Sequence, residues 1–153
     1  MKITSKALTD LTKDEYRACS YLNMRGNGMM LYSLMENKDN ANAHAVMAWE
    51  NNKLIGWALL VPHGDDSNWY STKHQKSKSR YVTQFYVRKP RRKQGVGAAL
   101  MRRVIELDAT PTVIPHDPQS ADFFASYPIV TEKCRRDLIQ EAKQRKKRKL
   151  TAA

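Results

Sequence analysis

The stretch Arg92-Lys93-Gln94-Gly95-Val96-Gly97 decides the fold, because it joins a strand-like run to a helix-like run. Residues 81–87 (YVTQFYV), just upstream, are dense in β-branched and aromatic side chains, which is typical of a strand. Downstream, apolar residues recur at helical spacing, at Val96, Leu100, Val104 and Leu107. Glycines at the opening of a helix leave backbone N–H groups accessible to an anion, typically a phosphate. The sequence therefore predicts a strand–loop–helix unit with a phosphate site.

Two common phosphate-binding motifs do not fit this loop. A kinase-type P-loop requires Lys-Ser or Lys-Thr after a glycine, and neither glycine has one. A dinucleotide fingerprint, GxGxxG, requires a small residue where Leu100 stands. The loop is instead a short, basic phosphate site, with Arg91, Arg92 and Lys93 ahead of the glycines.

The same residues resemble the signature of the GCN5-related N-acetyltransferase (GNAT) family, which is usually written R/Q-x-x-G-x-G/A. Arg92, Gly95 and Gly97 match its fixed positions, and a strand, a proline turn and an Ala-Ala-Leu helix surround them as in that family. The resemblance implies an N-acetyltransferase that uses acetyl-CoA as co-substrate. In such an enzyme a primary amine, of a small molecule or a protein, attacks the thioester directly in a ternary complex.

The resemblance assigns the acetyl-CoA site residue by residue. In the family, backbone amides of the glycine loop hold the pyrophosphate, and the end of the preceding strand binds the pantetheine arm and polarises the thioester carbonyl. In this chain the strand end is Phe85, Tyr86 and Val87. Asp117 stands where the family often has an asparagine that contacts the pantetheine. The loop residues implied are Arg92, Lys93, Gln94, Gly95, Val96, Gly97 and Ala98.

The resemblance also implies the fold, an α/β domain of the GNAT acyl-CoA N-acyltransferase type with a mixed central sheet flanked by helices. It covers about residues 5–128. The family's closing β-hairpin is hard to find after that point: residues 129–131 supply one stub, and a basic helix takes the place of the rest. We therefore expect a GNAT-like domain over residues 1–136 and a basic C-terminal helix or tail over residues 137–153.

Local signals predict further elements. Thr12 and Glu15 form a capping box at the start of a helix that runs through residue 22, with Leu11 and Tyr16 as its hydrophobic staple. The other expected elements are a short helix at 29–35, strands at 43–50 and 54–61 joined by a turn, a long polar loop at 62–80, a short strand at 112–115, a helix from 118 to about 128, and a basic helix at 137–149.

The catalytic groups are less plain than the cofactor loop. The family's acid is often a tyrosine in the helix after the fifth strand, and Phe124, which cannot donate a proton, stands at that position. Tyr127, about one turn further on, is the candidate substitute, and a packed helix tyrosine is its other interpretation. His116 is the best positional candidate for the general base, because it follows the fifth strand and histidine titrates near neutrality. Its alternative is an exposed neighbour of a helix N-cap. Glu50 ends a strand beside a turn, and we expect it to be solvated.

Length and composition limit the class of protein. At 153 residues the chain is one domain of ordinary size. No run approaches the roughly 18 apolar residues of a membrane span, and no apolar signal region follows the N-terminus, so we expect a soluble, cytoplasmic protein without a membrane partner. Cys19 and Cys134 are far apart and lack metal-ligand spacing, so we expect neither a metal site nor a disulfide.

The formal charge of +12 is high for this length, and half of it lies in one segment without acids. The six cations of that segment are Lys143, Arg145, Lys146, Lys147, Arg148 and Lys149. Such a segment favours a nucleic acid or an acidic protein surface as partner, with a solvated, fraying terminus as the equal alternative. The sequence leaves the oligomeric state open.

A second function competes with the enzyme. It is a catalytically weakened or inactive protein of the GNAT fold that acts as a basic interaction module for a protein or nucleic-acid partner. Phe124 and the shortened hairpin favour this second function, whereas the intact glycine loop favours the enzyme.

Overall fold

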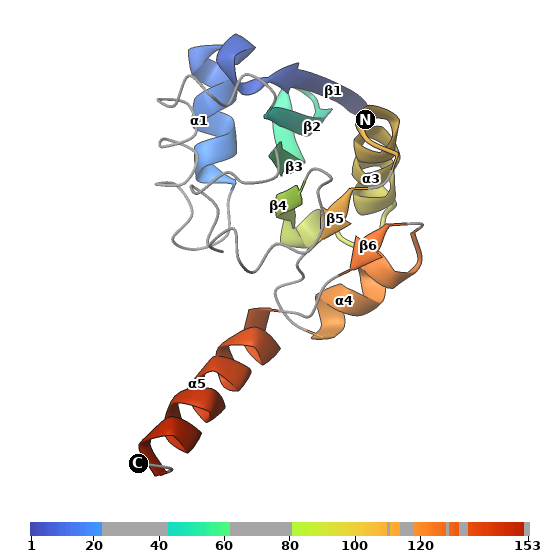
Figure 1. Ribbon diagram of the computed structural model, residues 1–153. Coiled ribbons are helices and arrows are strands. Elements are labelled where there is room, and N and C mark those ends of the chain that lie inside the picture. The colour runs from blue at the N-terminus through green and yellow to red at the C-terminus, as the bar shows by residue number, and fades with distance from the viewer. Residues whose placement is uncertain are drawn as a thin grey trace.

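The computed structural model describes residues 1–22, 43–61, 81–109, 111–113, 118–127, 129–131 and 135–151. These residues form six strands with helices between and after them (Figure 1). In chain order the elements are β1 (Lys2–Ala7), η1 (Leu8–Asp10), α1 (Lys13–Tyr21), β2 (His44–Glu50), β3 (Lys53–Val61), β4 (Tyr81–Val87), η4 (Lys89–Arg91), α3 (Val96–Leu107), β5 (Thr112–Val113), α4 (Pro118–Ala125), β6 (Val130–Thr131) and α5 (Arg135–Thr151).

The six strands form one mixed sheet in the order β1-β2-β3-β4-β5-β6. Strands β1 to β4 are antiparallel neighbours, whereas β4–β5 and β5–β6 are parallel pairs. Helix α1 lies on one face of the sheet and α3 on the other, while α5 points away from the sheet (Figure 1). The α/β fold with a mixed sheet and flanking helices is confirmed.

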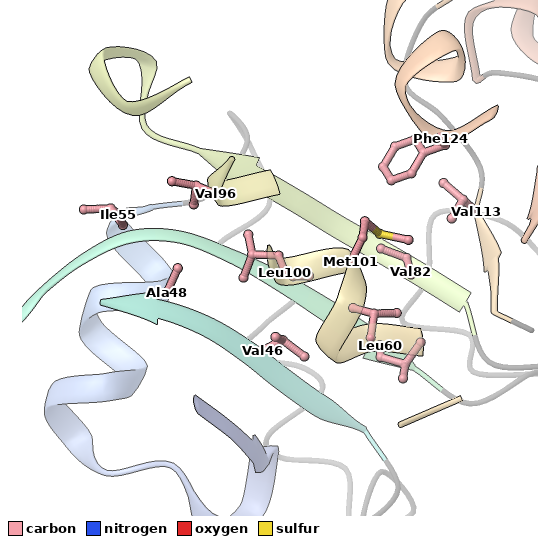
Figure 2. Close-up of a cluster of buried hydrophobic side chains, with 12 residues drawn as sticks. Val46, Ala48, Ile55, Leu60, Val82, Val96, Leu100, Met101, Val113 and Phe124 are labelled. Carbon is pink, nitrogen blue, oxygen red and sulfur yellow. The ribbon is translucent and has the colours of Figure 1, made fainter. Parts of the chain in front are cut away.

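Burial of both faces explains why β2 and β3 read as nearly continuous apolar runs. In β2, Ala45 and Met47 belong to the core beneath α1, and Val46 and Ala48 belong to the core beneath α3. The alternation follows from the two-residue period of a strand. Figure 2 shows the core beneath α3, in which Leu100 packs over the strands.

Several local predictions are confirmed. Helix α1 begins with the expected capping box: the Thr12 side chain accepts the N–H of Glu15, and the Glu15 side chain accepts the N–H of Thr12. Strands β2 and β3 form the expected hairpin. Its turn residues, Asn51 and Asn52, have φ values of 51° and 62°, the left-handed conformation that a two-residue hairpin turn of this kind requires.

Strand β1 is an element that the sequence analysis missed. Its residues KITSKA contain only one large apolar side chain, Ile3, and two lysines, so the usual strand pattern is weak. The strand exists because it pairs antiparallel with β2 over its whole length, from Lys2 opposite Trp49 to Ala7 opposite His44. Lysines suit an edge strand, where charge discourages pairing with other chains.

The C-terminal helix differs from its predicted bounds. Helix α5 begins at Arg135, two residues before the expected residue 137, and continues to Thr151. Strand β6 is the stub expected at residues 129–131, and it pairs parallel with β5. The expected helix at residues 29–35 and the expected loop at residues 62–80 lie outside the described residues.

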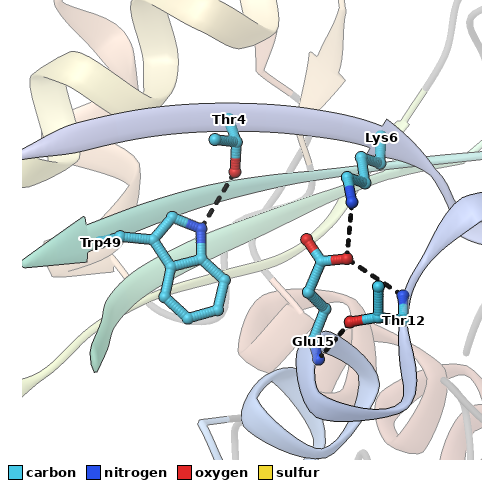
Figure 3. A network of polar contacts seen from close by, with 5 residues as sticks. All are labelled: Thr4, Lys6, Thr12, Glu15 and Trp49. Atoms are coloured by element: carbon cyan, nitrogen blue, oxygen red, sulfur yellow. Dashed lines mark hydrogen bonds and ion pairs between the residues drawn. The ribbon is translucent and has the colours of Figure 1, made fainter. Parts of the chain in front are cut away.

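A polar network ties β1 to α1 and β2 (Figure 3). Lys6 Nζ lies 2.8 Å from Glu15 Oε1, the same oxygen that accepts the N–H of Thr12. Although burial acts to raise it, the hydrogen bonds from Lys6 and Thr12 hold the pKa of Glu15 below its ordinary value. Trp49 Nε1 donates to Thr4 Oγ1 at 3.0 Å. These hydrogen bonds attach the edge strand β1 to α1 and to β2 on the side of the sheet that α1 covers.

Among the helices that the structure describes, none combines the length and the apolar character that crossing a bilayer would require.

Candidate functional site

Within the described residues, the C-terminal half of β4 has a strand partner only on the β3 side. With β3, β4 pairs from Tyr81 to Val87, but within the described residues it pairs with β5 only at Tyr81 and Val82. The register with β3 shifts between Leu59 and Leu60, which pair with Gln84 and Val82, so one extra residue bulges in β4. Beyond the bulge, the antiparallel ladder with β3 is the one that continues among the described residues.

The alternation of backbone groups shows which of them face the side without a strand. The carbonyl oxygen of Tyr86 faces β3, since a Cβ added to Gly56 would lie 3.1 Å from it. The N–H of Arg88 also bonds to β3, donating to Ile55 O at 2.8 Å. Because successive backbone groups point in opposite directions, those of Phe85 and Val87 point away from β3. They are donors and acceptors along what we call the open edge of β4, the stretch beside which the described residues include no second strand.

Two residues of the loop between β4 and α3 have a left-handed backbone conformation. Lys93 has φ 63°, and Gly95, the N-cap of α3, has φ 85° and ψ 3°. Glycine adopts this conformation without cost, whereas a lysine in it stores on the order of 1 kcal/mol of strain. Residues with strained backbones of this kind gather at ligand sites.

The N-terminus of α3 carries no side-chain cap. The first hydrogen bond of the helix runs from Ala99 N to Gly95 O at 3.1 Å, so the amides of Val96, Gly97 and Ala98 have no partner within the helix. Uncapped amides and the positive end of the helix dipole together favour an anion. Lys93 is exposed beside them and adds positive charge.

The arginines of the loop anchor it to neighbouring backbone and side chains. Arg88 Nε donates to Leu54 O at 2.8 Å, and Arg91 Nη2 lies 2.8 Å from Glu50 Oε1. Arg92 Nε donates to Val87 O at 3.0 Å, and its guanidinium lies 5.3 Å from the centre of the Tyr86 ring. The β2–β3 hairpin therefore holds the loop in place.

Two expectations are corrected by these contacts. Arg91 was counted among the charges available to a phosphate, but it forms an ion pair with Glu50. Glu50 was expected to be solvated, but it is half-buried and pairs with Arg91. Sequence spacing did not show the pair, because its two residues meet only when the β2–β3 hairpin lies beside the loop.

The sequence that builds β4, the glycine loop and the uncapped helix matches a known family. A sequence model of the "Acetyltransferase (GNAT) family" matches residues 6–111. The chain belongs to the GNAT family. The match includes β4, the loop and all of α3, the elements that carry the signature in the sequence. No curated protein matches the sequence.

Solved structures of acyltransferases share this GNAT fold. The chain resembles an acyl-CoA N-acyltransferase from Pseudomonas aeruginosa, with 17% identity, a TM-score of 0.55, and 82% of this chain and 84% of that chain covered. It also resembles the aminoglycoside 6'-N-acetyltransferase AAC(6')-IG from Acinetobacter haemolyticus (14% identity, TM-score 0.52, 95% and 88% covered). A third neighbour is AAC(6')-Iy in complex with a CoA bisubstrate analogue (11% identity, TM-score 0.51, 95% and 88% covered). At these identities the likeness concerns the fold.

Helix α4 brings an aromatic cluster to the GNAT loop. Phe85 of β4 lies 5.5 Å from Phe123 and 5.2 Å from Phe124, measured between ring centres. The ring of Tyr127 lies 5.4 Å from that of Phe123. Phe123 is partly exposed, whereas Phe124 is buried in the core beneath α3. The cluster, defined as these four rings, joins α4 to the open end of β4.

The structure brings together most of the residues expected at the acetyl-CoA site. Strand end and loop are contiguous, and the cluster touches both, since a Cβ at Gly97 would lie 3.6 Å from the ring of Phe85. Tyr127 is half-buried and packs against the core beneath α3. His116 and Asp117 lie outside the described residues. The sequence analysis missed the role of Phe123, which no motif marks.

Within the described part of the chain, no three His, Cys, Asp or Glu side chains gather closely enough to hold a metal ion.

Proposed function

We propose that this GNAT protein is an acetyl-CoA-dependent N-acetyltransferase that transfers an acetyl group to a primary amine of a small molecule or a protein. The observation that carries the proposal is the open edge of β4 beside the uncapped N-terminus of α3. An extended pantetheine arm with a pyrophosphate at one end requires such an arrangement of backbone donors followed by an anion site.

The residues present fit acetyl-CoA at both ends of this surface. The amides of Val96, Gly97 and Ala98, with Lys93 beside them, would hold the pyrophosphate. The backbone groups of Phe85 and the N–H of Val87 would bond to the pantetheine arm, as an added strand does, while Arg92 Nε holds the carbonyl oxygen of Val87. Gln94 and Gly95 shape the turn: Gln94 Nε2 donates to Pro90 O at 3.2 Å. Tyr86 supports Arg92 by stacking.

The chemistry requires few side chains. Acetyl-CoA supplies an activated acetyl thioester when it is bound. Holding the amine next to that carbon converts a bimolecular reaction into a local one, which is the largest expected contribution. A backbone N–H at the open end of β4 would stabilise negative charge on the thioester oxygen during direct attack. The chain must also remove a proton from the amine and protonate the departing sulfur.

We propose His116 as the general base and Tyr127 as the acid, with Asp117 contacting the pantetheine arm. His116 and Asp117 follow β5 closely in the sequence, and β5 pairs with β4. Tyr127, two residues beyond the end of α4, has a hydroxyl, whereas the buried Phe124 has none. A primary amine as acceptor is supported by the resemblance to two aminoglycoside N-acetyltransferases.

Phe124 also supports the second candidate, a catalytically weakened or inactive protein that acts as an interaction module. Its ring is 5% exposed and packs edge-on against Phe85, so an apolar contact replaces the family's usual acid. In that case residues 1–136 would keep the GNAT fold, and the basic segment 137–153 would bind a nucleic acid or an acidic protein.

Calorimetric titration of acetyl-CoA, CoA and dephospho-CoA tests the proposed site. We expect Lys93→Glu to weaken acetyl-CoA binding at least tenfold, because it reverses a charge beside the helix N-terminus. Lys13→Glu is the matched control: it makes the same change of charge on exposed α1 and should leave the affinity unchanged. If the wild-type protein fails to bind acetyl-CoA and CoA, the proposed enzyme function is wrong, and the interaction module remains.

A thiol-release assay separates the two candidates. Polyamines, aminoglycosides and peptide amines are offered as acceptors at saturating acetyl-CoA. Release of free CoA that depends on the acceptor supports the enzyme. Tight binding of acetyl-CoA without release, across the whole panel, supports the interaction module instead.

A further inference from the structure

Helix α5 is charged on every side of its C-terminal half. Residues 143–149 are all exposed, and six of the seven are cations. An α-helix turns by about 100° per residue, so, counted from Lys143, the cations fall near 0°, 40°, 140°, 200°, 240° and 300°. The widest gap, about 100°, is occupied by the polar residues Gln144 and Thr151. This half of the helix therefore has no apolar face.

A helix with this charge distribution fits poorly against a membrane or a protein core. An interfacial membrane helix needs a broad apolar side opposite its basic side. A helix that packs on a domain needs an apolar stripe about 100° wide. Here α5 points away from the sheet (Figure 1), and its final large apolar residue, Leu150, is 73% exposed.

The cations of α5 repel one another. Lys143 and Lys147 are four residues apart, as are Arg145 and Lys149, and like charges at this spacing destabilise a helix by a few tenths of a kcal/mol per pair. The two acids of the helix, Asp137 and Glu141, both precede this half. The helix dipole favours cations at the C-terminal end, but it does not remove their mutual repulsion. A partner with closely spaced negative charge on several sides would remove it.

We propose that α5 is a nucleic-acid-binding arm that contacts the phosphodiester backbone without regard to sequence. A duplex carries one phosphate charge per about 1.7 Å of axis, and its groove places phosphates on both sides of an inserted helix. An acidic protein surface would face only one side of α5 and leave the other cations unmatched. The proposal goes beyond the acetyltransferase function and does not depend on it.

Nucleic-acid binding should also order the helix. Basic segments commonly fold when they bind RNA, since the polyanion removes the repulsion that opposes the helix. We therefore expect amide hydrogen exchange at residues 143–151 to slow when a duplex is added to the full-length protein. Exchange in β2 and β3 should not change, because these strands lie in the core of the sheet.

The test measures the affinity of the full chain for labelled RNA and DNA duplexes of about 20 base pairs, and for the RNA single strand, over a series of salt concentrations. The variant carries Lys146→Gln, Lys147→Gln and Lys149→Gln. Its control carries Lys2→Gln, Lys13→Gln and Lys53→Gln, which remove the same charge from exposed positions elsewhere. At about 0.1 M salt we expect the α5 variant to bind on the order of 100-fold more weakly, with a salt slope smaller by about three, while the control changes little.

The outcomes decide whether α5 binds nucleic acid. Stronger binding to duplex RNA, duplex DNA or the single strand identifies the form of nucleic acid that the arm prefers. Equal losses in both variants would mean that general charge, not α5, binds, and the proposal would be wrong. It would also be wrong if the protein bound vesicles of anionic lipid but no nucleic acid. Acetyl-CoA binding by the α5 variant should equal that of the wild type, so failure here leaves the proposed function unaffected.

Discussion

Gly97 faces the ring of Phe123 so closely that a Cβ at residue 97 would lie 3.2 Å from Phe123 Cζ. The second glycine of the signature therefore leaves room for an aromatic ring of α4 as well as for a ligand. Three elements meet at this point: β4 through Phe85, the start of α3, and α4.

We predict energetic coupling between Gly97 and Phe123. Alanine should gain up to about 1 kcal/mol over glycine within a helix, but its methyl group forces the Phe123 ring to shift. Gly97→Ala should therefore stabilise a Phe123→Ala protein more than it stabilises the wild type, by about 0.5–1 kcal/mol in urea unfolding. Gly95→Ala is the control, because open space surrounds residue 95 and its strain, at φ 85°, does not involve Phe123. Equal effects in both backgrounds would contradict the contact.

The ion pair between Glu50 and Arg91 should hold the loop weakly but measurably. Both side chains are partly exposed, at 32% and 42%, so we expect a coupling energy below about 1 kcal/mol. A double-mutant cycle with Glu50→Gln and Arg91→Gln measures it by chemical unfolding. The coupling should disappear in about 1 M salt, because screening is then nearly complete. Coupling that survives high salt would point to packing instead of charge.

The stability of α1 should depend on pH through Glu15. Its pKa is lowered in the folded protein, so the ionised carboxylate stabilises the fold above the pKa of the unfolded chain. That contribution is lost as the pH falls through the folded-state pKa. Glu15→Gln should thus destabilise the protein near pH 7 by about 0.5–1 kcal/mol and have less effect near pH 3. Unfolding of wild type and variant across this range measures the difference, and Lys6→Gln should reduce it.

Steady-state kinetics test the proposed acid, Tyr127, and the proposed base, His116, separately. Tyr127→Phe should lower kcat at least tenfold with little change in KM, because it removes the proposed acid and keeps the ring that packs on Phe123. Tyr21→Phe, at an 87% exposed position, is the control. His116→Gln should abolish the decline of kcat/KM toward low pH. If kcat is unchanged in the Tyr127→Phe variant, Tyr127 is not the acid and contributes only packing.

Cys19 should resist thiol reagents until the protein unfolds. It is fully buried, and burial, with a smaller effect of the Glu15 charge, raises the pKa of its thiol to about 12. In a Cys134→Ser variant, labelling by a thiol reagent at pH 8 should therefore follow global or local unfolding of α1. Fast labelling in the absence of denaturant would show that α1 opens readily.

Sequence was sufficient wherever a local signal existed. The β-branched run of β4, the helical spacing of α3, the paired asparagines and the capping box each depend on residues close together in the chain. The cofactor loop belonged to this group, since its glycines report on backbone conformation at their own positions.

Contacts between segments far apart in the chain could not be predicted from these local patterns. β1 has a weak pattern because its stability comes from pairing with β2, some forty residues later. The Glu50–Arg91 pair and the Gly97–Phe123 contact exist only because the hairpin and α4 converge on the loop. Spacing along one chain does not encode that convergence. The family resemblance placed the helix after the fifth strand at the site, but the contact of Phe123 with Gly97 could not be predicted.

The two halves of the sheet differ in how firmly they are held. β1 and β2 pair at six positions, whereas β4–β5 and β5–β6 pair at two each within the described residues. Short ladders exchange their amide hydrogens through sub-global opening, at lower free energy than the core. We therefore expect the amides of β5 and β6 to exchange faster than those of β2 and β3. Helix α4 should exchange with the core beneath α3 instead, because its Phe124 is buried in that core.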